Sequence, residues 1–63
     1  MSMISVSSSA IAAIGYASGT LRVIFHSGRA YDHPGVPYHV FIEFLHASSM
    51  GRYYNEHIRG RYR

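Results

Sequence analysis

The chain has 63 residues, with six arginines, no lysine, three acidic residues, five histidines and no cysteine, which gives a formal net charge of +3. A chain of this length forms one domain, here residues 1–63, and is too short for a nucleotide-binding α/β sheet or a barrel. The lack of cysteine excludes disulfides, thiol catalysis and cysteine-based metal sites. Hydrophobic residues make up 48% of the chain, so it is too apolar to be intrinsically disordered.

The sequence carries no sign of a membrane or secretory segment. No apolar run approaches the ~20 residues that span a bilayer. No basic residue precedes Arg22, so the basic start of a signal peptide is missing. We therefore expect a cytoplasmic protein with no membrane partner. Because so small a domain lacks disulfides, we also expect support from self-association as a homo-oligomer.

The net charge is concentrated at the C-terminal end. Residues 1–51 hold two arginines and two carboxylates, which balance, whereas residues 52–63 hold four arginines and one glutamate. The whole excess of +3 therefore lies in the last twelve residues. Anionic partners are the kind of ligand that such a segment attracts.

The first half of the chain predicts short β-strands joined by tight turns. Alternating and β-branched residues indicate strands over Met3–Ser7, Ile11–Tyr16, Thr20–His26 and Arg29–His33. Gly19 and Gly28 supply the positive φ angles that hairpin turns need. These features predict an antiparallel meander of three or four strands.

The second half predicts two short helices. Pro37 suits a first helical turn, and apolar residues at helical spacing indicate a helix from Pro37 to Ala47. Ser49 is a candidate N-cap for a second helix that ends at Gly60. The predicted fold is α+β, with both helices packed on one face of the meander. The predicted core comprises Val6, Ile14, Leu21, Val23, Phe25, Val40, Phe44, Leu45, Tyr54 and Ile58.

With its strands and helices in this order, the sequence resembles the KTSC domain family. That family occurs at the C-terminus of some lysyl-tRNA synthetases and as short bacterial and phage proteins. The matching residues are Ser8, Ile11, Ile14-Gly15-Tyr16, Leu21, Val23, Phe25, Gly28, Tyr31, Val36-Pro37, Ala47, Ser49, Gly51, Tyr54-Asn55, Ile58 and Tyr62. Two positions depart from the pattern: His33 stands where a second tyrosine is usual, and Ala17 where aspartate is frequent. If that tyrosine makes an essential contact, His33 has to replace it by stacking or donation. The resemblance implies RNA binding.

The C-terminal end interleaves arginines with aromatic rings, as single-stranded nucleic acid requires. Guanidinium groups bind phosphates, and bases stack on aromatic faces at ~1–3 kcal/mol each. The candidate residues are Arg52, Tyr53, Arg59, Arg61, Tyr62 and Arg63. The alternative is that Tyr54 and Ile58 belong to the core, while the arginines only favour a helix C-terminus.

A second candidate surface is the strand face that carries Arg29, Tyr31 and His33, extended by Arg22 and His26. A sheet face with aromatic and basic groups is a known platform for bases. The alternative is that Tyr31 lies under a helix as part of the core.

A metal site and an active site are less supported. His39, Glu43 and His46 fall on one stripe of the first predicted helix, and two imidazoles and a carboxylate suit Zn²⁺, but the spacing is not that of a zinc protease. The alternative is a solvated helix face, and we expect no metal or other cofactor. No nucleophile elbow or phosphate loop is present, so we expect no enzyme activity.

We thus carry three functional hypotheses. The first is a non-catalytic accessory module that binds RNA or single-stranded nucleic acid. The second is a protein-interaction module that self-associates through Tyr38, Ile42 and the exposed sheet edges. The third is an oligomer that holds a small anionic nucleotide between arginines of adjacent subunits.

Overall fold

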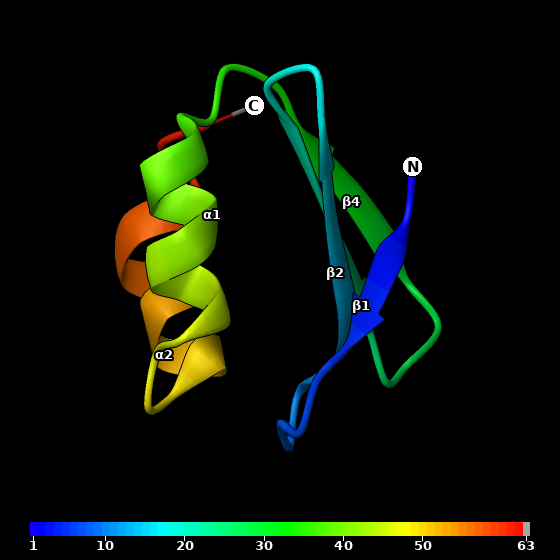
Figure 1. The fold of residues 1–63 in the computed structure, drawn as a ribbon. Coiled ribbons are helices and arrows are strands. Elements are labelled where there is room, and N and C mark those ends of the chain that lie inside the picture. The colour runs from blue at the N-terminus through cyan, green and yellow to red at the C-terminus, as the bar shows by residue number, and fades with distance from the viewer. Residues whose placement is uncertain (63) are drawn as a thin grey trace.

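An antiparallel sheet and a helical layer face each other in the computed structural model, which describes residues 1–62 (Figure 1). The strands pair in the order β1-β2-β3-β4, each antiparallel to its neighbour. Their bounds are Met3–Ser5 for β1, Ile11–Ala17 for β2, Thr20–Phe25 for β3 and Ala30–His33 for β4. The predicted meander is confirmed, with four strands.

Tight turns keep consecutive strands adjacent. Ser18 and Gly19, between β2 and β3, have φ angles of 51° and 77°. Two consecutive positive φ angles are typical of the type I′ turn, whose twist matches that of the flanking strands. β1 ends at Ser5, two residues before the predicted end at Ser7.

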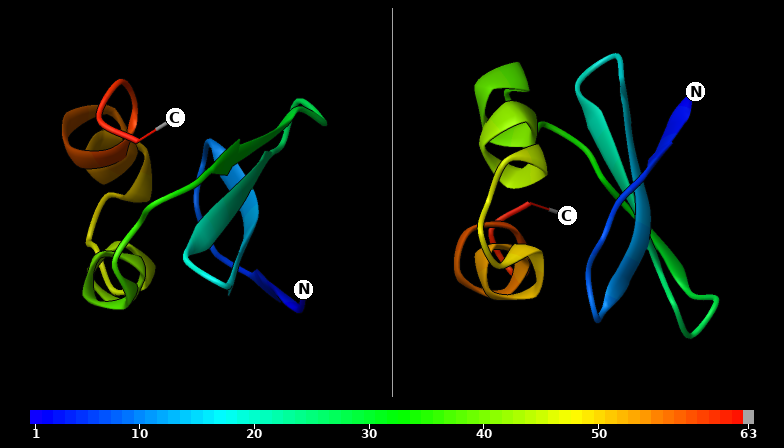
Figure 2. Two further views of the ribbon diagram at one scale, coloured as in Figure 1. Left: turned by 90° about the horizontal axis from the view of Figure 1, so that it is seen from above. Right: turned by 60° about the horizontal axis from the view of Figure 1, so that its bottom comes forward.

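The helical layer consists of α1 (Tyr38–Leu45), α2 (Met50–Tyr53) and the π-helical segment η1 (Tyr54–Ile58). Figure 2 shows all of it on one side of the sheet. Pro37 is the N-cap of α1 rather than its first helical residue. Ser49 caps α2 as predicted, since its Oγ accepts from the Arg52 N–H at 3.4 Å.

The change from α2 to η1 was not predicted, because the sequence indicates one continuous helix to Gly60. The Arg59 N–H donates to the Tyr54 carbonyl at 2.8 Å, a spacing of five residues that defines a π-helical turn. Such turns are rare and occur frequently at functional sites. This one ends the helical layer next to β4.

The inner face of the sheet and the helices share one hydrophobic core. The buried apolar residues are Ile11, Ile14, Leu21, Val23, Val36, Val40, Phe41, Phe44, Met50, Tyr54 and Ile58. Seven of the ten predicted core residues are in this set, and Val6, Phe25 and Leu45 pack against it partly buried. Ile11, Val36, Phe41 and Met50 were missed, because short segments leave the register of a strand or helix face open.

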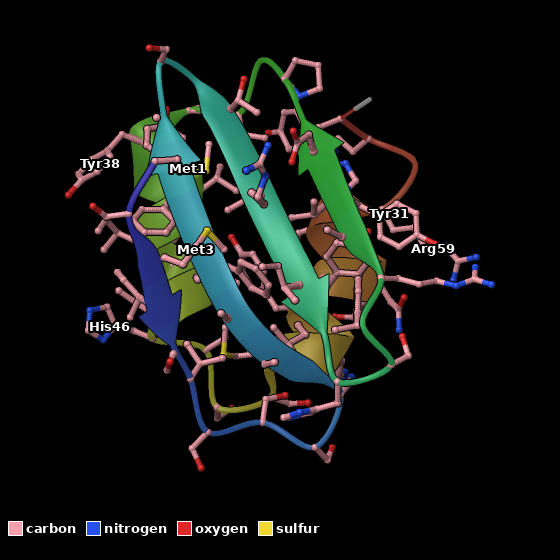
Figure 3. All side chains as sticks on the ribbon, turned by 90° about the vertical axis from the view of Figure 1, so that its right-hand side faces the viewer. Met1, Met3, Tyr31, Tyr38, His46 and Arg59 are labelled. Atoms are coloured by element: carbon pink, nitrogen blue, oxygen red, sulfur yellow. The ribbon has the colours of Figure 1, made fainter. Side chains whose placement is uncertain are left out.

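The start of the chain covers part of the outer face of the sheet, at Gly15. A Cβ at this position would stand 2.5 Å from the Met3 sulfur and 3.1 Å from Cγ of Met1. Figure 3 shows Met1 and Met3 lying across this face. The same Cβ would stand 3.0 Å from the backbone oxygen of Ser2, so a side chain there would force the start of the chain to shift, which favours glycine in the middle of this strand.

His33 is buried and joins the sheet to the end of the helical layer. Its Nδ1–H donates to the Tyr62 carbonyl at 2.8 Å, and its Nε2 accepts from the Tyr54 hydroxyl at 2.9 Å. Burial raises the pKa of Tyr54, so this hydroxyl stays a proton donor. His33 stands at the position where the resemblance leads us to expect a second tyrosine. It donates a hydrogen bond there, to the Tyr62 carbonyl, but this bond lies within the core.

This buried chain of hydrogen bonds predicts a cost for removing one hydroxyl. Tyr54→Phe leaves His33 Nε2 without its donor, and we expect the free energy of unfolding to fall by about 1–3 kcal/mol. Tyr38→Phe is the matched control, because Tyr38 is 61% exposed and its hydroxyl is open to water. Urea unfolding followed by circular dichroism measures both. Equal stability of the two variants would contradict the role assigned to His33.

Candidate functional site

A cavity of about 570 Å³ opens between the β3–β4 hairpin and the second helical segment. It is lined by Ser9, Ala10, Phe25, His26, Ser27, Arg29, Tyr31, Gly51, Tyr54, Asn55 and Arg59. These residues come from three separate parts of the chain. The volume falls in the range of ~300–1,000 Å³ that is usual for small-molecule sites.

The hairpin side of the cavity presents an arginine next to an aromatic ring. Tyr31 is 43% exposed, although it lies on the helix-facing side of β4 opposite Val23. It projects beyond the helices because β4 is the edge strand. The Arg29 Nη1 donates to the Tyr31 hydroxyl at 3.4 Å, and Phe25 packs edge-on against Tyr31 with ring centroids 5.8 Å apart.

The helical side of the cavity consists of residues spaced four apart. Gly51, Asn55 and Arg59 follow one another along one side of α2 and η1. Tyr54 closes the bottom, where its ring meets Phe25 edge-on at 5.3 Å. Figure 3 shows Arg59 extending beside Tyr31 at the β4 edge of the molecule.

The loop before β2 forms the third wall. Ser8 Oγ accepts from the backbone N–H groups of Ala10 and Ile11, both at 3.3 Å, which fixes the loop. The His26 Nε2–H donates to the Ser8 carbonyl at 2.8 Å, which leaves Nδ1 as the acceptor nitrogen of the neutral ring. The loop and the hairpin therefore hold each other in place.

The charge of this cavity is uniformly positive. No carboxylate of residues 1–62 lines it, whereas Arg29 and Arg59 both do, and both are exposed. The ion pairs of the described chain lie elsewhere: Arg22 with Asp32 at 2.7 Å and Arg52 with Glu56 at 3.1 Å. The cavity thus combines an exposed aromatic ring with two guanidinium groups that form no ion pair within residues 1–62.

The structure divides the predicted strand platform. Arg29 and Tyr31 line the cavity and His26 joins them, but His33 is 8% exposed and bonded within the core, so it is not a surface contact. Arg22 lies on the outer face, bonded to Asp32, whose pKa it lowers. Arg22 pairs with Asp32 and therefore points to the opposite face from Tyr31 and His33, which pair with Val23 and Leu21. His33 shares the face of Tyr31, but its bonds to Tyr54 and Tyr62 hold it in the core.

The predicted C-terminal array is divided as well. Arg59 reaches the cavity, but Arg52 is paired with Glu56 on another side of α2. Tyr53 stacks on Phe44 and donates its hydroxyl to Glu43 at 2.9 Å, so its ring serves helix packing. Arg61 is exposed, Tyr62 packs partly buried against the core, and Arg63 lies outside the described residues.

The structure also shows where the residues of the predicted metal stripe and of the predicted self-association surface lie. In the predicted metal stripe, Glu43 accepts a hydrogen bond from Tyr53, and no group of three ligating side chains in residues 1–62 is placed to hold a metal. Tyr38 is exposed at the start of α1, while Ile42 packs partly buried against the core. Self-association stays a prediction.

Sequence reasoning missed Ser9, Ala10, Ser27, Gly51 and Asn55 as cavity residues. Gly51 and Asn55 were noticed only as part of the family resemblance, whereas Tyr54 was also predicted as a core residue. Only that resemblance pointed to Asn55, since a lone polar residue on an exposed helix face has no local pattern that marks it as functional.

A four-stranded meander with a helical layer on one face, and a basic–aromatic cavity between them, defines a small α+β domain class. The model of the KTSC domain family matches residues 7–62, so the chain belongs to this family. The crystal structure of a KTSC domain protein from Yersinia pestis is similar, with 33% identity and a TM-score of 0.93. The match covers 98% of this chain and 90% of that one. No curated protein matches.

None of the helices in residues 1–62 has the length and apolar character needed to cross a membrane.

The structural role of Tyr53 predicts an unusual titration. Burial, together with the hydrogen bond to Glu43, raises the pKa of Tyr53 from 10.0 to about 12. Its neutral form is favoured in the fold, so this stabilisation is complete below pH 10 and is lost as the pH rises towards 12. Carbon NMR of labelled tyrosine rings measures the pKa directly.

The acidic partner supplies the control for this titration. Glu43→Gln removes the neighbouring charge and is expected to lower the pKa of Tyr53, whereas Glu56→Gln is expected to leave it unchanged. A Tyr53 that titrates at the ordinary tyrosine value of 10.0 in the wild-type protein would contradict its burial and its bond to Glu43.

Proposed function

We propose that this KTSC domain is a non-catalytic module that binds RNA or other single-stranded nucleic acid at the cavity between its two layers. The observation that carries the proposal is that Arg29 and Arg59 lie beside the exposed Tyr31 and form no ion pair within residues 1–62, in a cavity that no carboxylate of those residues lines. Phosphate and base are the two groups that this combination fits.

The chemistry of each group supports this reading. A guanidinium group binds phosphate oxygens with two parallel N–H bonds, and arginine also stacks on bases. The Tyr31 ring is held in place by Phe25 and by the bond from Arg29, so a base that stacks on it meets a fixed surface. Unpaired bases are available in single strands, whereas duplex bases are hidden in the stack.

A binding role also fits the titratable groups around the cavity better than catalysis does. His26 is the one histidine among the lining residues, and its Nε2–H is already engaged by the Ser8 carbonyl. Hydrolytic or phosphoryl-transfer chemistry needs a nucleophile or a base with a positioned partner. The other acid–base groups that line the cavity, the hydroxyls of Tyr31 and Tyr54, are bonded to Arg29 and to His33.

The number of arginines sets the expected salt dependence. Each phosphate contact to a single strand contributes about −0.7 to the slope of log K against log salt concentration, so two contacts predict a slope of about −1.4. Arg29→Ala and Arg59→Ala should each reduce the slope by about 0.7 and weaken binding of an eight-nucleotide RNA about tenfold. Fluorescence anisotropy at four salt concentrations measures both quantities.

Arg52→Ala is the matched control, because Arg52 is an exposed arginine that is paired with Glu56 away from the cavity. It should leave the slope and the affinity close to the wild-type values. A larger loss with Arg52→Ala than with the two cavity variants would place binding on the C-terminal helix instead, and a wild-type protein that does not retain RNA at low salt would overturn the proposal.

A further inference from the structure

The cavity has the dimensions and the chemistry of a site for one nucleotide rather than a groove for a strand. Its walls come from the loop before β2, the hairpin and the helical segment, and together they border an open cavity of about 570 Å³. A groove that tracks a strand carries cations and rings repeated along its length. Here two arginines and the exposed ring of Tyr31 line a single cavity.

The number of cations agrees with one nucleotide. Arg29 precedes β4 in the sheet layer and Arg59 follows η1 in the helical layer, so the cavity receives one arginine from each layer. An internal nucleotide of a strand is flanked by two phosphates, one on each side of its sugar. Two guanidinium groups and one exposed aromatic ring therefore correspond to a base with its two flanking phosphates.

The polar lining supplies groups that recognise the edge of a base. The carboxamide of Asn55 is exposed at the cavity and offers both donors and an acceptor, the pairing that asparagine uses with adenine. His26 adds Nδ1 as an acceptor, because its Nε2–H is bonded to the Ser8 carbonyl. Phe25 and Tyr54 make the apolar floor on which these polar groups stand.

Gly51 leaves the space between these groups open. It has no positive φ angle, and a Cβ built on it would lie 3.7 Å from the Ala10 Cβ, an ordinary contact. Glycine is therefore not demanded there by backbone strain or by a close approach. A longer side chain at this position would occupy the cavity that Gly51 and Ala10 line.

We propose that the cavity binds one unpaired nucleotide, with its flanking phosphates on Arg29 and Arg59, its base beside Tyr31 and the base edge within reach of Asn55. This inference rests on the proposed function and names the minimal ligand: a nucleoside 3′,5′-bisphosphate. It assigns the nucleotide to a cavity within one chain rather than to a space between subunits.

The experiment compares three small ligands by isothermal titration calorimetry at low salt: adenosine, adenosine 5′-monophosphate and adenosine 3′,5′-bisphosphate. We expect the bisphosphate to bind with one site per chain and each removed phosphate to weaken binding about tenfold. The bisphosphate should also displace a labelled eight-nucleotide RNA. If the RNA binds but a hundredfold excess of bisphosphate does not displace it, the one-nucleotide site is wrong while the proposed function stands. If neither ligand binds, both are wrong.

Two substitutions test the location. Gly51→Met fills the cavity, and we expect it to weaken bisphosphate binding at least tenfold, whereas Ser48→Met, an added methionine at an exposed position outside the cavity, should bind as the wild type does. Thermal unfolding checks that both fold. Asn55→Ala serves as a second variant, and it should reduce the preference for adenosine over uridine bisphosphate. Unchanged affinity in Gly51→Met and unchanged preference in Asn55→Ala would overturn the proposal.

Discussion

The packing of Tyr54 between the two layers is the contact on which the rest of the molecule depends. Its hydroxyl donates to His33 on the edge strand, its ring packs edge-on against Phe25 of β3, and a further ring contact reaches Phe44 of α1. The same residue begins the π-helical segment and forms the bottom of the cavity. A buried hydroxyl needs a hydrogen-bond partner. The bond from Tyr54 to His33 therefore holds the helical layer at a set distance from β4.

The cavity is a consequence of that spacing. The edge strand extends beyond the helices, so Tyr31 is exposed next to a well-packed core, and the π-helical turn carries Asn55 and Arg59 to the same opening. Arg29 from the sheet layer and Arg59 from the helical layer therefore line the same cavity, and no carboxylate of residues 1–62 lines it. The C-terminal arginines therefore have different surroundings: Arg52 is paired with Glu56, whereas Arg59 lines the cavity.

Much of the fold could be predicted from the sequence because the signals are local. Alternation in Thr20–Phe25, the turn at Gly19 and the N-cap at Ser49 each depend on a few neighbouring residues. The cavity could not be predicted in the same way, because it joins a loop, a hairpin and a helix that only tertiary packing brings together. His33 illustrates the difference: it lies on the predicted strand, but only the contacts to Tyr54 and Tyr62 place it in the core. The π-helical turn has no sequence signal that separates it from an α-helix.

The most direct measurement is a titration of nitrogen-labelled protein with a single-stranded RNA octamer at low salt, followed by NMR of the backbone amides and the arginine Nε–H groups. We expect the largest shifts at Arg29, Tyr31, Asn55 and Arg59, on both sides of the cavity. Shifts centred on Arg52 and Tyr53, with the cavity residues unchanged, would contradict the assignment of the binding site to the space between the sheet and the helices.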